Sequence, residues 1–352
     1  MILNLKRFLR HFINKIIHGK INMNSKGAKT MKPTIRDVAK KANVSVSTVS
    51  RVINNKGYVH ESTRKVVEKV IAELGFVPNQ LARSLTTGSS RIIGVIIPHV
   101  GATFYGELIA GIESQALASG YKVLFCQTND DPNREIEYLH FFEQYNIDGL
   151  IIASNFSNYE KLAELKIPLI TVDHILDENI PSITSNNIKG GELAAQLFLK
   201  QQRKNLIVFR GPSFLLTTEE RTIGFLKVIK KANLYAEIFD FDLLSPDENL
   251  IEQILITNNK TDAIFCFSDT LALATLNVLK KLKIDVPKDL SLVGYDDSVL
   301  CNWTTPKLTS IHQSVKFMGK QSFLKLNQLI RGVELEILHD VIDVNLVLRA
   351  SH

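Results

Sequence analysis

Apolar and polar segments alternate along residues 91–352 in a way that predicts an α/β body. Eight short runs are apolar and rich in β-branched residues, and helical stretches separate them. The runs cover residues 92–98, 122–127, 149–153, 169–173, 205–210, 236–241, 263–268 and 290–295. Strands that alternate with helices favour parallel sheets covered by helices on both faces, so we expect doubly wound sheets here.

A different pattern occupies residues 34–74, where apolar positions recur at helical spacing. Thr34, followed by Asp37, predicts the start of a first helix, and Ser45 predicts the start of a second. A third helix is expected over residues 61–74. Two short helices joined by a three-residue turn form a helix-turn-helix, whose second helix enters the major groove of DNA.

The outer face of the second predicted helix carries Ser47, Thr48, Ser50 and Arg51. Short hydroxyl side chains allow the helix to approach DNA closely, and an arginine can donate two hydrogen bonds to the edge of a guanine. The alternative interpretation is an ordinary helical hairpin with a polar outer face. In the linker that follows, Leu85 is a candidate wedge between base pairs of the minor groove.

The charge is concentrated at the front of the chain. Residues 1–30 carry +7 and residues 32–90 carry +6, whereas the remainder carries −7 against a total of +6. A basic front on an acidic body indicates contact with a polyanion, although solvated surface charge alone would give the same sum.

Residues 1–30 interleave apolar and basic side chains at helical spacing. A membrane-surface helix and a targeting sequence are two interpretations. A third is translation upstream of the true start, and we favour a start at Met31 because the capped, patterned segment begins directly after it. No run of 18 apolar residues predicts a membrane span.

The front of the chain closely resembles the DNA-binding head and hinge of the LacI/GalR family of bacterial repressors. The resemblance is carried by residues 34–45 (TIRDVAKKANVS), 48–54 (TVSRVIN) and 82–85 (ARSL), and it extends from about residue 32 to the C-terminus. His60 departs from the family, which usually has a serine capping the third helix, so we expect a weaker cap. The resemblance implies that the DNA contacts are Thr34, Ser47, Thr48, Ser50, Arg51, Asn54, Arg83 and Leu85.

The same resemblance implies the domain organisation. Residues 1–31 are expected to be a basic extension, residues 32–90 the helix-turn-helix head and hinge, and residues 91–352 a domain for effector binding and dimerisation. That body is expected to be similar to periplasmic sugar-binding proteins, in which two doubly wound subdomains face each other across a cleft.

Candidate effector contacts lie just after predicted strands, because ligands of parallel sheets bind outside the carboxyl ends of the strands. Carboxylates and arginines hydrogen-bond hydroxyls, and aromatic faces stack on sugar rings. The alternative for each residue is a helix cap or a surface ion pair. The candidates are Phe104, Tyr105, Asp173, His174, Thr217, Arg221, Asp269 and Asp296. By resemblance, Arg221 and Asp296 are the strongest of these.

Two departures bear on the effector. The purine-responsive branch carries an arginine at the position of Leu215, and Ser185 replaces an aspartate that is often seen before Asn186. A purine is therefore disfavoured, and a sugar or sugar phosphate is expected. Residues 205–225 and 262–300 are similar to sucrose-operon repressors, so an effector of the sucrose or fructose type fits. Whether it acts as inducer or corepressor remains open.

We therefore predict a dimeric transcriptional repressor that binds a pseudo-palindromic operator, responds to a sugar, and uses no cofactor or metal. The chain has no GxSxG, P-loop or GxGxxG motif after a strand, so an enzyme is not expected. Three dispersed cysteines suit the cytoplasm, where a bacterial repressor would associate with the nucleoid. The alternatives are a sugar-binding protein without a regulatory role and a corepressor-dependent global carbon regulator. An RNA-binding protein is disfavoured because aromatic residues do not interleave with the basic ones.

Overall fold

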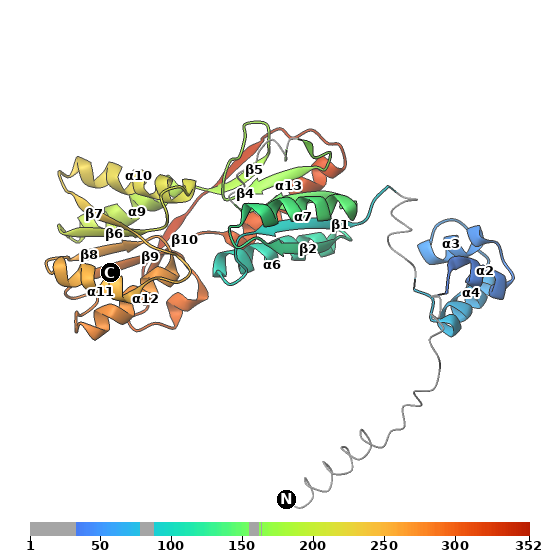
Figure 1. Cartoon of the computed structure of the whole chain (residues 1–352), viewed down its shortest axis with the longest axis horizontal. Coiled ribbons are helices and arrows are strands. Elements are labelled where there is room, and N and C mark those ends of the chain that lie inside the picture. Colours follow the sequence, from blue (N-terminus) through green and yellow to red (C-terminus); the bar gives the residue numbers. More distant parts are fainter. Residues whose placement is uncertain (1–32, 78–87, 155–161, 163) are drawn as a thin grey trace, which may run out of the picture. The chain divides into compact units, whose positions relative to one another are not determined.

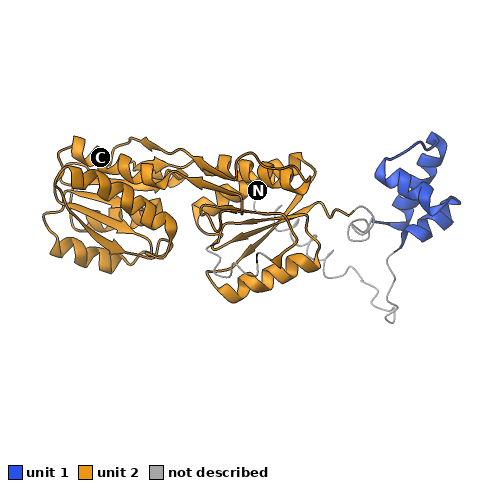
Figure 2. Ribbon diagram, turned by 90° about the horizontal axis from the view of Figure 1, so that it is seen from above, with its two compact units in different colours: residues 1–79 blue, residues 80–352 orange. Residues whose placement is uncertain are grey.

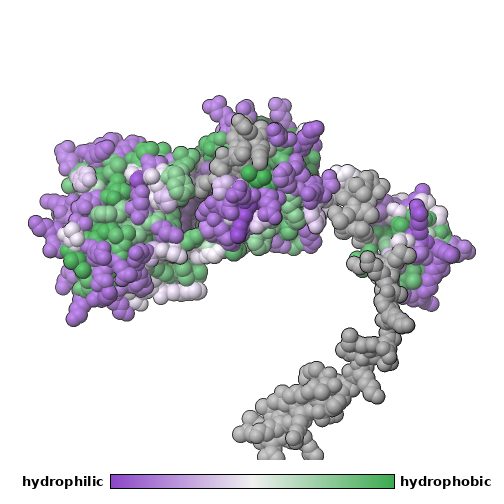
Figure 3. Space-filling view, viewed as in Figure 1, coloured by the Kyte–Doolittle hydropathy of each residue, from purple (hydrophilic) through white to green (hydrophobic). Residues whose placement is uncertain are grey.

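The computed structural model describes residues 33–77, 88–154, 162 and 164–352. The chain divides into two compact units, residues 1–79 and residues 80–352, which Figure 2 colours blue and orange. In the part of the chain so described, every helix is too short or too polar to traverse a bilayer. Hydrophilic side chains project over much of the outline of each unit, with hydrophobic residues between them (Figure 3).

The described residues of the first unit form three helices around a small apolar core. The helices are α2 (Ile35–Ala42), α3 (Val46–Asn54) and α4 (Glu61–Leu74). Val38, Val49 and Val67 are completely buried where the three helices meet. The apolar stripes therefore face inward as their spacing predicted, and the predicted helix-turn-helix is confirmed.

Each of these helices begins at a side-chain cap. The N–H of Asp37 donates to Thr34 Oγ1 at 3.4 Å, and Asp37 Oδ2 accepts the N–H of Thr34 at 2.8 Å. Ser45 Oγ accepts a backbone N–H from the first turn of α3 at 3.1 Å. His60 Nδ1 accepts the N–H of Ser62 at 3.4 Å. The histidine thus replaces the expected serine cap, with a hydrogen bond longer than the usual range.

The described residues of the second unit form two six-stranded sheets. The strands of the second unit are β1 (Ile92–Ile97), β2 (Lys122–Gln127), β3 (Gly149–Ile152), β4 (Leu169–Val172), β5 (Ser182–Ser185), β6 (Leu206–Arg210), β7 (Ala236–Asp240), β8 (Ala263–Cys266), β9 (Ser291–Asp296), β10 (Thr309–His312), β11 (His339–Ile342) and β12 (Asn345–Val347). Their order is β11-β5-β4-β3-β1-β2 in the first sheet and β12-β10-β9-β8-β6-β7 in the second. Neighbouring strands are parallel, except that β12 runs antiparallel to β10.

Helices cover both faces of each sheet (Figure 1). They are α6 (Thr103–Ala118), α7 (Pro132–Gln144), α9 (Asn187–Lys200), α10 (Leu216–Lys231), α11 (Glu248–Thr257), α12 (Asp269–Lys281) and α13 (Val315–Ile330), with a short 3₁₀ helix η1 (Val299–Asn302). On the first sheet, α6 and α13 bury Leu108 and Phe323 against one face, and α7 buries Phe142 against the other. On the second sheet, α9 and α10 bury Phe198 and Phe225 opposite α11 and α12. The doubly wound architecture is confirmed.

Four of the described strands, β5, β10, β11 and β12, have no counterpart among the predicted runs. They are three or four residues long, and polar side chains such as Ser182 and Ser310 interrupt their apolar pattern. These strands lie where the chain passes between the sheets, because β5 leads into α9 and β10 leads into α13. The antiparallel β12 corrects the expectation of purely parallel sheets.

Candidate functional site

The outer face of α3 presents the candidate DNA contacts of the first unit. Ser47 and Arg51 are exposed, whereas Val49 and Val52 are buried on the opposite side of the helix. A long arginine surrounded by short hydroxyl side chains can reach the edge of a base without steric obstruction. This arrangement suits insertion of α3 into a major groove.

Hydrogen bonds within the unit already engage the other polar candidates of α3. Ser45 Oγ lies 2.7 Å from Ser47 Oγ and 2.8 Å from Thr48 Oγ1. The amide Nδ2 of Asn54 donates to Ser50 Oγ at 3.2 Å. These contacts orient the hydroxyl groups along one face, where each oxygen retains further capacity for a phosphate or a base.

Of the three remaining candidate DNA contacts, one lies in the described part of the chain. Thr34 is exposed and caps α2, so its position at a helix N-terminus suits contact with a phosphate. Arg83 and Leu85 lie outside the described residues.

In the second unit, Arg221 of α10 is the centre of a buried polar cluster. Its side chain is only 6% exposed. Nε donates to Asn187 Oδ1 at 2.9 Å, and Nη1 donates to the carbonyl of Phe267 at 2.8 Å. The guanidinium carbon lies 3.7 Å from the centroid of the Tyr295 ring, which is a close cation–π contact. Arg221 therefore has one defined orientation before any ligand arrives.

Two adjacent glycines in α9 make this orientation possible. A Cβ at Gly190 would lie 2.3 Å from the hydroxyl of Tyr295, and one at Gly191 would lie 2.1 Å from the carbonyl oxygen of Arg221. Gly224 approaches α9 equally closely from α10, where a Cβ would lie 1.9 Å from the carbonyl oxygen of Ile188. Without side chains at these positions, α9 and α10 pack backbone to backbone and hold Arg221 and Tyr295 in register.

Two aspartates approach Arg221 from the carboxyl ends of strands in different sheets. Asp173 directly follows β4 of the first sheet, and Asp296 ends β9 of the second. Both have a left-handed backbone, with φ of 70° at Asp173 and 103° at Asp296. Such conformations are strained for residues other than glycine and cluster at binding sites. Gln313 Nε2 donates to Asp296 Oδ1 at 2.7 Å.

Burial and mutual repulsion keep the carboxyl groups from ionising at their usual pH. Burial raises the pKa of Asp173 to about 6, although the positive charge of Arg221 opposes this shift. Burial and the charge of Asp269 raise the pKa of Asp296 to about 8, again against Arg221. Burial also raises the pKa of Tyr105, and the charges of Asp173 and Asp296 add to the effect. Groups from both sheets thus share one electrostatic environment.

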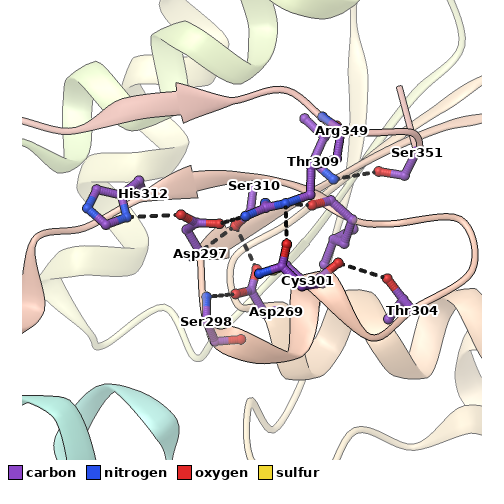
Figure 4. Close-up of polar contacts among 12 residues, drawn as sticks. Asp269, Asp297, Ser298, Cys301, Thr304, Thr309, Ser310, His312, Arg349 and Ser351 are labelled. Atoms are coloured by element: carbon purple, nitrogen blue, oxygen red, sulfur yellow. Dashed lines mark hydrogen bonds and ion pairs between the residues drawn. The ribbon is translucent and has the colours of Figure 1, made fainter.

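Asp269 serves a different purpose, which Figure 4 shows. It is 1% exposed, its Oδ2 accepts the N–H of Ser298 at 2.6 Å, and its Oδ1 accepts the hydroxyl of Ser310 at 2.6 Å. Both carboxylate oxygens are therefore engaged within the fold. We interpret Asp269 as a residue that holds the loop after β9, and thereby Asp296, rather than as a ligand contact. It is not the cap of α12, because Ser268 occupies that position.

Polar contacts around Asp297 join three segments of the chain. Asp297 lies 3.0 Å from His312 Nδ1 at the end of β10 and 2.6 Å from Arg349 Nη2 near the C-terminus. The polar contacts in Figure 4 converge on this loop. Asp297 therefore ties the loop that carries Asp296 to the strand that leaves for the other sheet.

The other predicted contacts occupy varied positions. Phe104 is 9% exposed and belongs to the apolar core of the first sheet, where its ring meets Tyr105 edge-on at 5.1 Å. Thr217 is half-buried near the start of α10. His174 is 8% exposed; its Nδ1 bonds the carbonyl of Val172 at 3.1 Å, and burial lowers its pKa. Phe104 fits a core role, whereas Tyr105 and His174 remain candidate contacts.

Sequence reasoning missed several residues of the cluster. Ser154 lies two residues after β3 with its hydroxyl buried, so the rule that selected Asp173 also marks Ser154 as a candidate. Gln313 follows β10, a strand that the apolar pattern did not reveal. Asn187 and Tyr295 orient Arg221 from α9 and β9, and no local pattern marks that role.

Two surface cavities lie away from this cluster. One, of about 510 Å³, is lined by residues that precede β6, β7 and β8, including Lys204 and Tyr235. The other, of about 630 Å³, is lined by residues that precede β3 and β4, including Asp148 and Lys166. Both therefore lie at the amino ends of strands, whereas Arg221, Asp173 and Asp296 gather at the carboxyl ends, where ligands of such sheets bind.

Comparisons with known protein families match both units. Residues 34–79 match the family described as "Bacterial regulatory proteins, lacI family". Residues 195–352 match the "Periplasmic binding protein-like domain".

Individual proteins are similar over nearly the whole chain. A ribose operon repressor of Halalkalibacterium halodurans is 34% identical, with 90% of this chain and 96% of that protein covered. A sucrose operon repressor of Pediococcus pentosaceus is 36% identical, with 86% of this chain and 93% of that protein covered. The solved structure of a lac repressor dimer bound to operator and the anti-inducer ONPF has a TM-score of 0.82 at 26% identity, with coverage of 91% and 98%.

Proposed function

The chain belongs to the lacI family of bacterial regulatory proteins, and we propose that it represses a sugar-utilisation operon until a sugar releases it from the operator. The regulatory role follows from the family, two members of which are named as a ribose and a sucrose operon repressor. Ribose and sucrose appear in the names of those relatives, so a small sugar is the effector class that we carry over to this chain.

The observation that best supports an effector site is the convergence of Arg221, Asp173 and Asp296 from two sheets. Their electrostatic coupling joins the carboxyl end of β4 to that of β9 and to a helix of the second sheet. A ligand bound among them contacts both sheets at once. Such a ligand can change the equilibrium between two arrangements of the sheets, because its contacts differ between them.

We assign the DNA contacts to Thr34, Ser47, Thr48, Ser50, Arg51, Asn54, Arg83 and Leu85. A single head covers only half of an operator, so we propose a homodimer on a pseudo-palindromic site. The related lac repressor is a dimer on its operator, which supports this proposal. We also propose that the repressor acts at the nucleoid in the bacterial cytoplasm, without catalytic activity, cofactor or membrane partner.

Effector binding reaches the head through the strands that connect the sheets. Asp296 accepts a hydrogen bond from Gln313, and Asp297 contacts His312. The loop that carries Asp296 is therefore attached to the connection between β10 and α13. A change in the angle between the sheets would move the starts of the two linkers in a dimer relative to each other. Leu85 would then lose its proposed contact with the centre of the operator.

Binding of the full chain to its own upstream DNA, with and without sugars, tests this function. We expect specific binding at nanomolar concentration that ribose, fructose or sucrose weakens. Removal of residues 1–79 should abolish operator binding while sugar binding persists in the remaining unit. Operator affinity that survives this truncation would contradict the assignment of DNA binding to the head. Sugar binding without specific DNA binding by the full chain would favour a sugar-binding protein, and tighter DNA binding with sugar would indicate a corepressor.

A further inference from the structure

Asp148 bonds the point where the linker from the head enters the second unit. It directly precedes β3, and its carboxylate accepts hydrogen bonds from the segment just before β1. Oδ1 accepts the N–H of Ser90 at 2.6 Å and the hydroxyl of the same residue at 2.8 Å. Oδ2 accepts the N–H of Arg91 at 3.2 Å and the hydroxyl of Ser89. We call Asp148 with Ser89, Ser90 and Arg91 the linker anchor.

Both sides of the linker anchor are themselves held in the fold. Ser90 is 7% exposed, and its Oγ also accepts the N–H of Ile92 in β1 at 3.2 Å. The N–H of Asp148 donates to the carbonyl of Ile92 at 2.8 Å. Arg91 has a left-handed backbone with φ of 57°, and its guanidinium carbon lies 5.0 Å from the centroid of the buried Tyr121 ring. The last residues before β1 are therefore fixed in one conformation.

The second sheet repeats this arrangement without a linker. Asp262 directly precedes β8 as Asp148 precedes β3, and β8 pairs with β6 as β3 pairs with β1. Asp262 accepts the N–H groups of Lys204 at 3.0 Å and of Asn205 at 2.9 Å, which are the two residues before β6. A carboxylate at this position thus satisfies the backbone at the start of a strand in both sheets.

The two arrangements differ in the segment that they hold. The chain reaches β6 from α9 of the same unit, whereas it reaches β1 from the head. The hydroxyls of Ser89 and Ser90 both bond Asp148, so the first sheet holds its segment one residue further from the strand. In the second sheet, the side chain that bonds Asp262 is Asn205, directly next to the strand, at 3.4 Å. The extra contacts of the linker anchor therefore lie on the side that leads to the linker.

We propose that Asp148 is a positioning residue for operator binding, because it fixes where the linker leaves the body. The inference rests on the proposed function, since it concerns how the same protein holds its two heads on DNA. In the proposed dimer, the separation of the two linker anchors limits the spacing of the two heads on the half-sites. A loosened anchor enlarges the space that each head explores and lowers the effective concentration of the second head at its half-site.

The variant Asp148→Asn breaks the linker anchor selectively. An asparagine keeps the shape of the side chain, but only one of its two polar atoms accepts hydrogen bonds. The amide nitrogen then faces a backbone N–H, of either Ser90 or Arg91, which can only donate. Asp262→Asn makes the same change before β8 and is the matched control.

Hydrogen exchange of the full chain, without DNA or sugar, tests whether the anchor holds the linker. Asp148→Asn should raise the exchange rate of the amides in residues 88–92 by about tenfold or more. Asp262→Asn should leave that rate unchanged and raise exchange in residues 202–206 instead. Wild-type protection of residues 88–92 in Asp148→Asn would overturn the proposal.

Titration with upstream DNA tests the consequence for operator binding. Both variants should lower the unfolding temperature by a similar amount, about 2–4 °C, because each leaves a backbone N–H unpaired. Well below that temperature, Asp148→Asn should bind the upstream DNA about tenfold more weakly than the wild type, and Asp262→Asn should bind it within about twofold of the wild type. Equal DNA affinities of the two variants would leave Asp148 a purely structural role and contradict the proposal.

Ser90→Ala provides a second test that holds even if Asp148→Asn does not fold. It removes the hydroxyl from the linker anchor and keeps the backbone N–H that bonds Asp148. Affinity for the upstream DNA should fall about threefold. Lys204→Ala, at the equivalent position before β6, is its control and should leave that affinity unchanged. Equal affinities of Ser90→Ala and Lys204→Ala would count against the anchor.

The two proposals fail separately in these measurements. A wild-type chain that binds no DNA specifically refutes the repressor function, whereas hydrogen exchange still decides whether Asp148 holds the linker. A chain that binds its operator equally well with and without the linker anchor retains the repressor function and refutes the positioning role.

Discussion

The two units of this protein present their functional residues in opposite ways. In the first unit, Ser47 and Arg51 come from one turn of one helix and lie on its exposed face. In the second unit, Asp173, Arg221 and Asp296 are separated by scores of residues and are brought together in a buried cluster by two sheets. A local pattern is sufficient for a surface that binds from outside, whereas a site that encloses its ligand needs the whole fold.

The largest expected effect tests the independence of the two units. Arg221→Ala removes a buried cation that orients Asn187 and faces two carboxylates. We expect sugar affinity to fall by about 100-fold or more, because truncation of a buried hydrogen-bonded charge costs about 2–5 kcal/mol. Operator affinity should change less than about threefold. Calorimetry measures the sugar affinity, and DNA titration measures the operator affinity.

Lys281→Ala is the matched control for that variant, because Lys281 is a largely exposed cation of the same unit, paired with Glu252. It should alter neither affinity. Wild-type sugar affinity in Arg221→Ala would remove Arg221 from the site.

The second prediction concerns the packing on which the buried site depends. Gly191→Ala places a methyl group 2.1 Å from the carbonyl oxygen of Arg221, so α9 and α10 must separate. We expect the free energy of unfolding to fall by about 2–3 kcal/mol, as in other overpacked cores. Thermal unfolding of the chain measures it, and sugar binding should weaken in parallel.

Gly106→Ala provides the control, because a Cβ at this position in α6 meets no atom within 4 Å. This substitution should stabilise the chain by about 0.5–1 kcal/mol through the higher helix propensity of alanine. Equal effects of the two substitutions would show that the close approach of α9 and α10 is dispensable.

The exposed surface of the first unit gives the third prediction. Arg51→Ala should cost about 1–3 kcal/mol of operator affinity and relax the base preference at one position, as loss of a bidentate base contact does. Binding to a set of operators with single-base changes measures both. Sugar affinity should be unaffected. A uniform loss across all DNA sequences would instead identify Arg51 as a phosphate contact.

The smallest effect concerns the pH dependence of stability. Because the pKa of Asp296 is about 8, far above its usual value near 4, the folded protein holds a proton that the unfolded chain has released. Stability from this group is therefore lost as the pH rises towards 8. Between pH 7 and 8.5, where Asp173 is largely ionised, the free energy of unfolding of Asp296→Asn should fall by about 1 kcal/mol less than that of the wild type.

Thermal unfolding at the two pH values measures the difference, with Glu334→Gln as a control at an exposed position. Identical pH dependence in the wild type and Asp296→Asn would show that Asp296 ionises normally in the folded state.

Most of the first unit follows from local chemistry. Thr34 and Ser45 fix the start of α2 and of α3, since their side chains accept hydrogen bonds from free N–H groups of the first turn. The eight apolar runs of the body likewise coincide with strands. Six of them form inner strands, which are buried on both faces and must be apolar throughout, whereas the edge strands β2 and β7 are partly exposed. Asp173 and Asp296 were predictable because Asp173 ends one of those runs and Asp296 directly follows another.

Tertiary structure alone decided the rest. Strands that connect the sheets are too short and too polar to be predicted from an apolar pattern; they are β5, β10, β11 and β12. Their pairing depends on neighbouring strands that are already in place. Gln313 reaches Asp296 only through this assembly, whereas both carboxylate oxygens of Asp269, which also follows a strand, accept hydrogen bonds from Ser298 and Ser310. Sequence position places a side chain at the edge of a sheet, but only the packed neighbours determine whether its polar atoms remain free for a ligand.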